Sequence, residues 1–132
     1  MSDMNFNWMR ALVVEDNDFV RFMVKKYLTE FGFSAVDEAK NGIEGIEMLS
    51  EAPDVVICDI SMEPLNGFEF LKHLRNLPDA QKDTPVIFLT SNADVAAVQQ
   101  AKTLNVSSYL LKPVQPDLLR KKIAGLICSA TH

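Results

Sequence analysis

Four short apolar runs of this chain each end on reactive polar residues, and this pattern constrains the fold more than any other feature. The runs span residues 11–16, 54–59, 85–91 and 108–113, and they end on Glu15 and Asp16, on Asp59, on Thr90 and Ser91, and on Lys112 and Pro113. In a parallel sheet the carboxyl ends of the strands collect at one edge. Carboxylates crowded there repel one another unless a divalent cation is bound, and oxygen-only ligands suit Mg²⁺. The pattern therefore predicts a metal-dependent phosphoryl site.

Length and charge narrow the class of protein. The 132 residues, 48% of them hydrophobic and 23% charged, fit one globular domain, predicted to span residues 1–132 with a core of about 10–126. A net charge of −5 argues against direct binding of nucleic acid. The chain has no apolar stretch near the roughly 20 residues that span a bilayer, and its start lacks a signal pattern. We therefore expect a cytoplasmic protein that does not bind membranes.

Segments of helical length separate the strands, which is typical of an α/β fold with a parallel sheet. A first helix is expected from Asp18, read as its cap, to Phe31, with Gly32 as its stop. Its apolar face is predicted from a four-residue repeat, and the repeat consists of Phe19, Met23, Tyr27 and Phe31. The other expected elements are a weak strand at 34–37, helices at 41–50, 66–75 and about 94–103, a polar loop at 78–84, and a last helix after Pro116. Phe6 and Trp8 either pack on this fold or belong to a connection to another domain.

These residues together resemble the receiver domain of two-component response regulators. The resemblance runs from about Arg10 to Leu126, and it is carried by residues 13–17, by residues 59–62 with Gly67, by Thr90 and Ser91, and by Lys112 and Pro113. Each motif alone is weak, but their shared order and spacing are specific. The resemblance implies a flavodoxin-like, doubly wound (βα)₅ fold with a five-stranded parallel sheet in the order 2-1-3-4-5.

The family resemblance also implies a role for each site residue. Asp59 would be the nucleophile that takes a phosphoryl group from a phosphohistidine and becomes an aspartyl phosphate. Mg²⁺, or Mn²⁺ in its place, would be held by Glu15, Asp16, Asp59 and the backbone carbonyl of Ser61. Lys112 would pair with a phosphoryl oxygen as a compact positive charge.

A conformational switch is the second implication of the resemblance. Thr90 would turn inward to bond a phosphoryl oxygen, Tyr109 would follow it, and the Lys112–Pro113 peptide bond would be cis. The switched surface would be the face of the fourth helix, fifth strand and fifth helix. The implied partners are a sensor histidine kinase or phosphotransfer domain, and an output protein or attached domain. The same residues have plainer interpretations one by one, since Tyr109 also suits a core position and Thr90 a helix cap.

Other classes of function fit less well. A haloacid-dehalogenase phosphatase needs an acid two residues after its nucleophile, where this chain has Ser61. A flavin-binding module of the same fold needs a phosphate loop after the first strand, and acids stand there instead. The nearest alternative is a degenerate receiver that acts as a phosphorylation-independent interaction module. We expect a domain that catalyses its own phosphorylation and dephosphorylation rather than turnover of a small substrate.

Two departures from the family pattern lie close to the predicted nucleophile. The family usually has Met-Pro three and four residues after the phosphoacceptor, whereas Glu63 separates Met62 from Pro64 here. Asn66 replaces a frequent Asp before Gly67, and either residue suits a helix N-cap. Neither change removes a group that the predicted chemistry requires.

Overall fold

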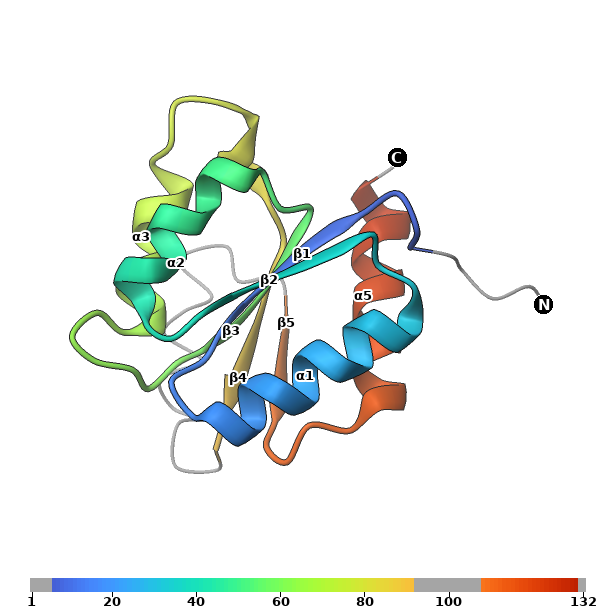
Figure 1. Ribbon diagram of the computed structural model, residues 1–132. Coiled ribbons are helices and arrows are strands. Elements are labelled where there is room, and N and C mark those ends of the chain that lie inside the picture. The colour runs from blue at the N-terminus through green and yellow to red at the C-terminus, as the bar shows by residue number, and fades with distance from the viewer. Residues whose placement is uncertain (1–5, 92–107, 131–132) are drawn as a thin grey trace.

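Five parallel strands form one sheet in the order β2-β1-β3-β4-β5, as predicted (Figure 1). The computed structural model describes residues 6–91 and 108–130. The strands are β1 (Arg10–Val14), β2 (Ala35–Ala39), β3 (Val55–Asp59), β4 (Val86–Thr90) and β5 (Ser108–Leu111). Every residue of β3 and β4 is buried, because helices cover both faces of a parallel sheet.

Helices cover the sheet in two layers (Figure 1). They are α1 (Asp18–Phe31) and α5 (Pro116–Ala130) on one face, and α2 (Gly42–Met48) and α3 (Gly67–Arg75) on the other, with short 3₁₀ turns η1 (Leu49–Glu51) and η2 (Ala80–Asp83). Alternate strand residues enter two separate hydrophobic clusters, since Val13 and Ile57 pack toward α1 and α5, whereas Leu12 and Val56 pack toward α2 and α3. The fourth helix expected at 94–103 lies outside the described residues.

The start and the buried face of α1 differ from the prediction. Asn17 is the N-cap, and its side-chain oxygen accepts the N–H of Val20 at 3.0 Å, whereas Asp18 is the first helical residue. Val24 and Leu28 are the fully buried residues of the helix. Of the predicted face, Tyr27 and Phe31 are partly buried and pack against the core, whereas Phe19 is 71% exposed. A four-residue repeat advances about 40° per step on a helix of 3.6 residues per turn, so Phe19 and Phe31 point in different directions. Gly32 ends the helix in the left-handed conformation, as predicted.

The other elements shift little from their predicted positions. β2 lies at 35–39 rather than 34–37, because its five residues pair one to one with the five residues of β1. Asn66 caps α3 and forms a capping box with Glu69. Within α2, a Cβ at Gly45 would lie 3.0 Å from the ring of Phe70, so the glycine lets α2 and α3 pack closely.

The segment that leads into β1 packs on the fold through Phe6. Phe6 is fully buried and stacks on Phe33 at a ring separation of 4.9 Å, with the Arg120 guanidinium 5.5 Å from its ring centre. Trp8, by contrast, is 64% exposed. Among the helices of residues 6–91 and 108–130, none combines the length and the apolar character needed to cross a bilayer.

Candidate functional site

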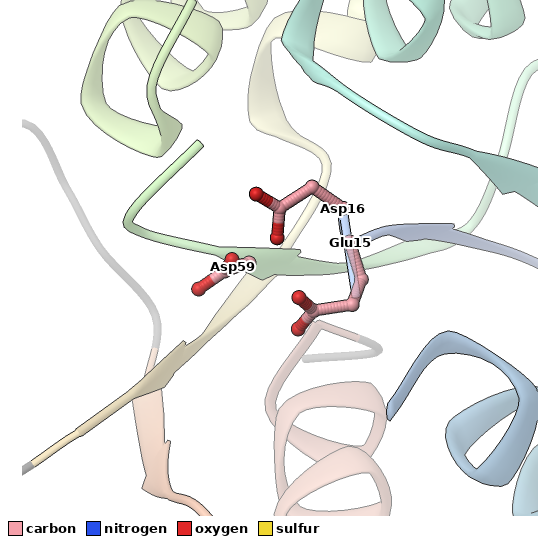
Figure 2. A group of neighbouring side chains, drawn as sticks. All are labelled: Glu15, Asp16 and Asp59. Carbon is pink, nitrogen blue, oxygen red and sulfur yellow. The ribbon is translucent and has the colours of Figure 1, made fainter. Parts of the chain in front are cut away.

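Three carboxylates meet where β1 and β3 end (Figure 2). Glu15 and Asp16 follow β1 directly, and Asp59 is the last residue of the neighbouring strand β3. One oxygen from each of the three lies within 4.8 Å of the others. Glu15 is fully buried, Asp59 is 3% exposed and Asp16 is exposed. The sheet thus brings together the three acids that the strand-end pattern singled out.

Lys112 lies between the two buried acids. It follows β5, and its Nζ lies 3.1 Å from Glu15 Oε1 and 3.1 Å from Asp59 Oδ1. Burial alone would lower the pKa of Lys112, but the two carboxylates raise it, so the side chain is a cation at neutral pH. The contact places one positive charge at a site with three acidic side chains.

Burial makes the charged forms of Glu15 and Asp59 unfavourable. It raises the pKa of Glu15 to about 7, with the nearby charge of Asp59 adding to the effect and Lys112 opposing it. Burial also raises the pKa of Asp59, and Lys112 partly offsets that rise. One positive charge does not neutralise the cluster, so the site favours an additional cation.

The donor set fits a hard divalent cation. Glu15 Oε1 is buried and contacts Lys112 as an ion pair, but it makes no hydrogen bond. Carboxylate oxygens are the ligands that Mg²⁺ takes in proteins, usually one or two of them beside several waters. Glu15, Asp16 and Asp59 are therefore the residues that would hold it.

The loop after β3 approaches the carboxylate of Asp59 closely. The backbone N–H of Ser61 donates to Asp59 Oδ1 at 3.3 Å, which brings the Ser61 backbone to the site, while the ligand role of its carbonyl stays a prediction. Gly67 begins α3, and a Cβ there would lie 2.6 Å from the backbone oxygen of Asp59. Only glycine lets α3 start this close to the backbone of Asp59. The Glu63–Pro64 bond of the same loop is cis.

The predicted switch residues lie on β4 and β5. Thr90 is fully buried, and its hydroxyl donates to the carbonyl of Ser91 at 3.0 Å. Tyr109 is 41% exposed, so its interpretation as a core residue is wrong. The Lys112–Pro113 peptide bond is cis, the geometry that the resemblance implies. The switching roles of Thr90 and Tyr109 stay predictions, and the fourth-helix part of the predicted surface lies outside the described residues.

Sequence reasoning missed Arg21 at this site. Its Nη1 donates to the backbone carbonyl of Glu15 at 2.9 Å, and its side chain is 11% exposed. The available signal was its spacing from Asp18, because residues three apart on a helix are neighbours and Asp18 begins the helix that follows Glu15 and Asp16.

The raised pKa of Glu15 predicts an unusual pH dependence of stability. Between its ordinary pKa of 4.5 and about 7, the folded chain binds more protons at Glu15 than the unfolded chain does. The free energy of unfolding therefore falls as pH rises through that window, by at most roughly 3 kcal/mol from this group. Urea unfolding of the cation-free protein in EDTA at pH 5.5 and pH 8 should show this loss.

Glu15→Gln isolates the contribution of this carboxyl. The amide cannot ionise, so the variant should lose less stability between the two pH values and should exceed the wild type at pH 8. Glu47→Gln, a matched change at an exposed position of α2, should leave the wild-type profile unchanged. An equal fall in stability for Glu15→Gln and wild type would contradict the assignment.

Comparison with known proteins gives a consistent result. Residues 11–124 match the family model of the response regulator receiver domain. The chain is 33% identical over 121 residues to the chemotaxis protein CheY homolog of Campylobacter jejuni, covering 90% of this chain and 92% of that protein. It is also 35% identical over 120 residues to the regulator of RpoS of Escherichia coli, covering 90% of this chain but 34% of that longer protein.

Solved structures agree with the sequence relatives. A putative response regulator from Chloroflexus aurantiacus superposes with a TM-score of 0.84 at 27% identity, covering 91% of this chain and 98% of that one. Chemotaxis protein CheY4 of Vibrio cholerae superposes with a TM-score of 0.79 at 32% identity, covering 88% of this chain and 96% of that one. Because the family model matches residues 11–124 and the sheet has the same strand order, the chain belongs to the response regulator receiver domain family.

Proposed function

We propose that Asp59 accepts a phosphoryl group from a phosphohistidine, with Glu15 and Asp16 holding Mg²⁺, and that the acyl phosphate changes how this domain binds a partner. The observation that carries the proposal is the meeting of Lys112 Nζ with Asp59 Oδ1 at 3.1 Å, beside three carboxylates within 4.8 Å. A nucleophile, a cation for the transferred group and a metal donor set thus share one edge of the sheet. In this proposal residues 1–132 form a single receiver domain.

The transfer forms one bond and breaks one. A carboxylate oxygen of Asp59 attacks phosphorus, the P–N bond to the donor imidazole breaks, and its electron pair stays on the imidazole nitrogen. Lys112 exchanges its contact with Asp59 Oδ1 for one with a phosphoryl oxygen and offsets the charge that develops there. When bound, Mg²⁺ supplies positive charge that keeps the carboxylates ionised and shields the incoming phosphoryl oxygens from them.

The groove beside the site supports a protein donor. It has a volume of about 250 Å³ and is lined by Phe19, Val20, Met23, Val24 and Tyr27 of α1 and by Lys112, Pro113 and Val114. Phe19 is 71% exposed at its rim, and Lys112 belongs both to this groove and to the acidic site. An apolar groove that shares Lys112 with the acidic site suits a kinase or phosphotransfer domain that presents its phosphohistidine to Asp59.

The output step rests on Thr90 and Tyr109. For Thr90 to bond a phosphoryl oxygen, its hydroxyl leaves the Ser91 carbonyl, and the exposed ring of Tyr109 then turns toward the space behind it. The exposed side chains near β5 and the start of α5, Leu111 and Leu118, would belong to the surface that the output partner contacts. The cytoplasmic location stays a prediction from the sequence.

Asp16→Asn tests the metal role of the acidic pair. Asp16 is exposed, so the change should leave the fold intact, but it removes one metal ligand. We expect phosphorylation by phosphoramidate, followed by intact mass, to need at least about tenfold more Mg²⁺ for the same yield. Glu30→Gln, an exposed acid near the end of α1, is the matched control. An Asp16→Asn protein with the wild-type Mg²⁺ dependence would remove Asp16 from the site.

A further inference from the structure

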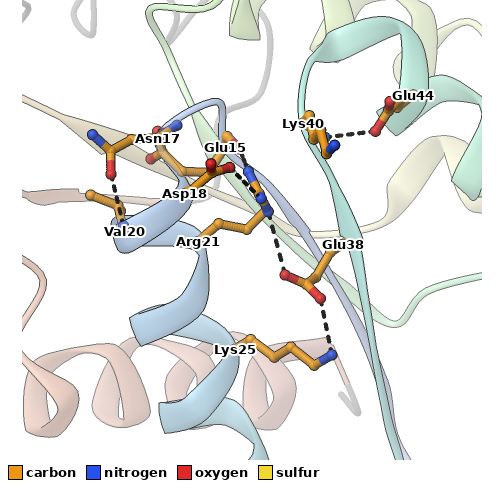
Figure 3. A network of polar contacts seen from close by, with 9 residues as sticks. All are labelled: Glu15, Asn17, Asp18, Val20, Arg21, Lys25, Glu38, Lys40 and Glu44. Atoms are coloured by element: carbon orange, nitrogen blue, oxygen red, sulfur yellow. Dashed lines mark hydrogen bonds and ion pairs between the residues drawn. The ribbon is translucent and has the colours of Figure 1, made fainter.

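One guanidinium, that of Arg21, ties together three segments around the acidic site (Figure 3). Nη1 donates to the backbone carbonyl of Glu15 at 2.9 Å, and Nη2 pairs with Asp18 Oδ1 at 2.6 Å. Nε lies 3.4 Å from Glu38 Oε1 on β2. The planar fork of Arg thus connects the end of β1, the first turn of α1 and the neighbouring strand.

The bond to Glu15 fixes the backbone that carries the metal donors. Glu15 follows the end of β1, and its own N–H donates to the carbonyl of Ala39 at 3.0 Å. Its carbonyl belongs to the peptide that joins Glu15 to Asp16, and Arg21 is the donor to that carbonyl. The Arg21 side chain therefore holds the peptide that sets the orientation of both Glu15 and Asp16.

The outer contacts of Arg21 balance its charge. Lys25 Nζ lies 3.0 Å from Glu38 Oε2, so two cations and two carboxylates form the network: Arg21, Lys25, Asp18 and Glu38 (Figure 3). The network has no formal net charge, so its long-range effect on the acidic site is small. The contribution of Arg21 is therefore mainly geometric.

We infer that Arg21 is a positioning residue for the cation site: by bonding the Glu15 carbonyl, it holds the carboxylates of Glu15 and Asp16 in the arrangement that binds Mg²⁺. The inference rests on the proposed function, because it concerns the metal required there. It assigns Arg21 no contact with the metal or with the phosphoryl group.

A positioning role and a purely electrostatic role for Arg21 predict opposite changes in Mg²⁺ affinity when Arg21 is replaced. Removal of a nearby positive charge would strengthen cation binding at an acidic site, since the carboxylates would lose a competing cation. Loss of the carbonyl bond would weaken cation binding, because second-shell contacts that orient ligands are worth about 10- to 100-fold in metal affinity. The sign of the change therefore separates the two explanations.

The test is calorimetric titration of Mg²⁺ into the full chain for wild type, Arg21→Met, Arg21→Lys and Lys25→Met. We expect Arg21→Met to weaken binding about tenfold, and Arg21→Lys, which keeps the charge but lacks the fork, to weaken it by a smaller factor. Lys25→Met removes a cation of the same network, but one that does not contact Glu15. The Mg²⁺ affinity of this variant should therefore stay within about twofold of wild type. Phosphorylation should need more Mg²⁺ in the Arg21 variants but reach the wild-type plateau.

Two results would overturn the inference, and they are distinguishable. If the wild type binds Mg²⁺ and both Arg21 variants bind it as tightly or more tightly, only the role of Arg21 is overturned. No Mg²⁺ binding by the wild type would overturn the proposed function and this inference with it. Should Arg21→Met fail to fold, Arg21→Lys decides, with wild-type affinity counting against the inference.

Discussion

Replacing Asp59 by Asn is expected to reduce phosphorylation by phosphoramidate at least about a thousandfold. The amide of Asn is a poor nucleophile toward phosphorus, whereas a carboxylate is a good one. In the wild type, the Asp59 carboxylate at the end of β3 also has Lys112 Nζ 3.1 Å from its Oδ1, where the cation can offset charge on the phosphoryl group. Intact mass after incubation with Mg²⁺ measures the effect as the fraction of chains that gain one phosphoryl group.

The loss should come from chemistry and not from misfolding. Asn has nearly the shape of Asp, and the change removes one charge from a site where the charge of Asp59 raises the pKa of Glu15. We expect the variant to be at least as resistant to urea as the wild type when no divalent cation is present. Asp54→Asn, an exposed acid just before β3, is the matched control and should be phosphorylated normally. Wild-type labelling of Asp59→Asn would show that another residue accepts the group.

The second large effect is expected for Lys112→Met. Methionine keeps much of the apolar stem but removes the cation that lies 3.1 Å from both buried acids. A preorganised donor aimed at developing charge is typically worth a factor of about 100 to 1,000 in rate, so we expect a fall of about a hundredfold in the rate of phosphorylation. The rate of mass gain at saturating Mg²⁺ measures it.

The Lys112 variant also has an expected effect on the acids themselves. Because Lys112 lowers the pKa of both Glu15 and Asp59, its loss should raise both pKa values further. The pH at which the phosphorylation rate rises should therefore be higher for the variant than for the wild type. Lys122→Met, an exposed change on α5, is the control. A Lys112→Met protein that is phosphorylated at the wild-type rate would exclude Lys112 from the transfer.

The sheet and most of its helices could be predicted because their signals are local. Continuous apolar runs of strand length identify β1, β3 and β4, and the positions of Asp59 and Lys112 follow because each comes at the end of its strand. Parallel pairing then places those ends on one edge without further information. That β1 and β3 are neighbours, so that Glu15 and Asp16 meet Asp59, followed from the sheet order that the family resemblance implies.

Details that depend on packing between distant segments could not be predicted. Asn17 and Asp18 both suit an N-cap, and the sequence does not distinguish them. The buried face of α1 follows from how the helix lies on the sheet, so the four-residue repeat was right for Tyr27 and Phe31 but wrong for Phe19. Burial of Phe6 depends on a ring stack with Phe33, and the role of Arg21 depends on the carbonyl of Glu15, which is a backbone acceptor that no residue type reveals.

The proposed phosphorylation of Asp59 is tested most simply by the intact mass of the wild-type chain after phosphoramidate treatment, once with Mg²⁺ and once with EDTA. We expect a gain of one phosphoryl group with Mg²⁺ and little or none with EDTA, because in the proposed mechanism the carboxylates of Glu15 and Asp16, which lie beside Asp59, need a bound cation before Asp59 reacts. No gain in a folded sample supplied with Mg²⁺ would rule out phosphorylation of Asp59 under these conditions and favour a receiver that works without it. Equal gain in EDTA would rule out the metal-dependent mechanism.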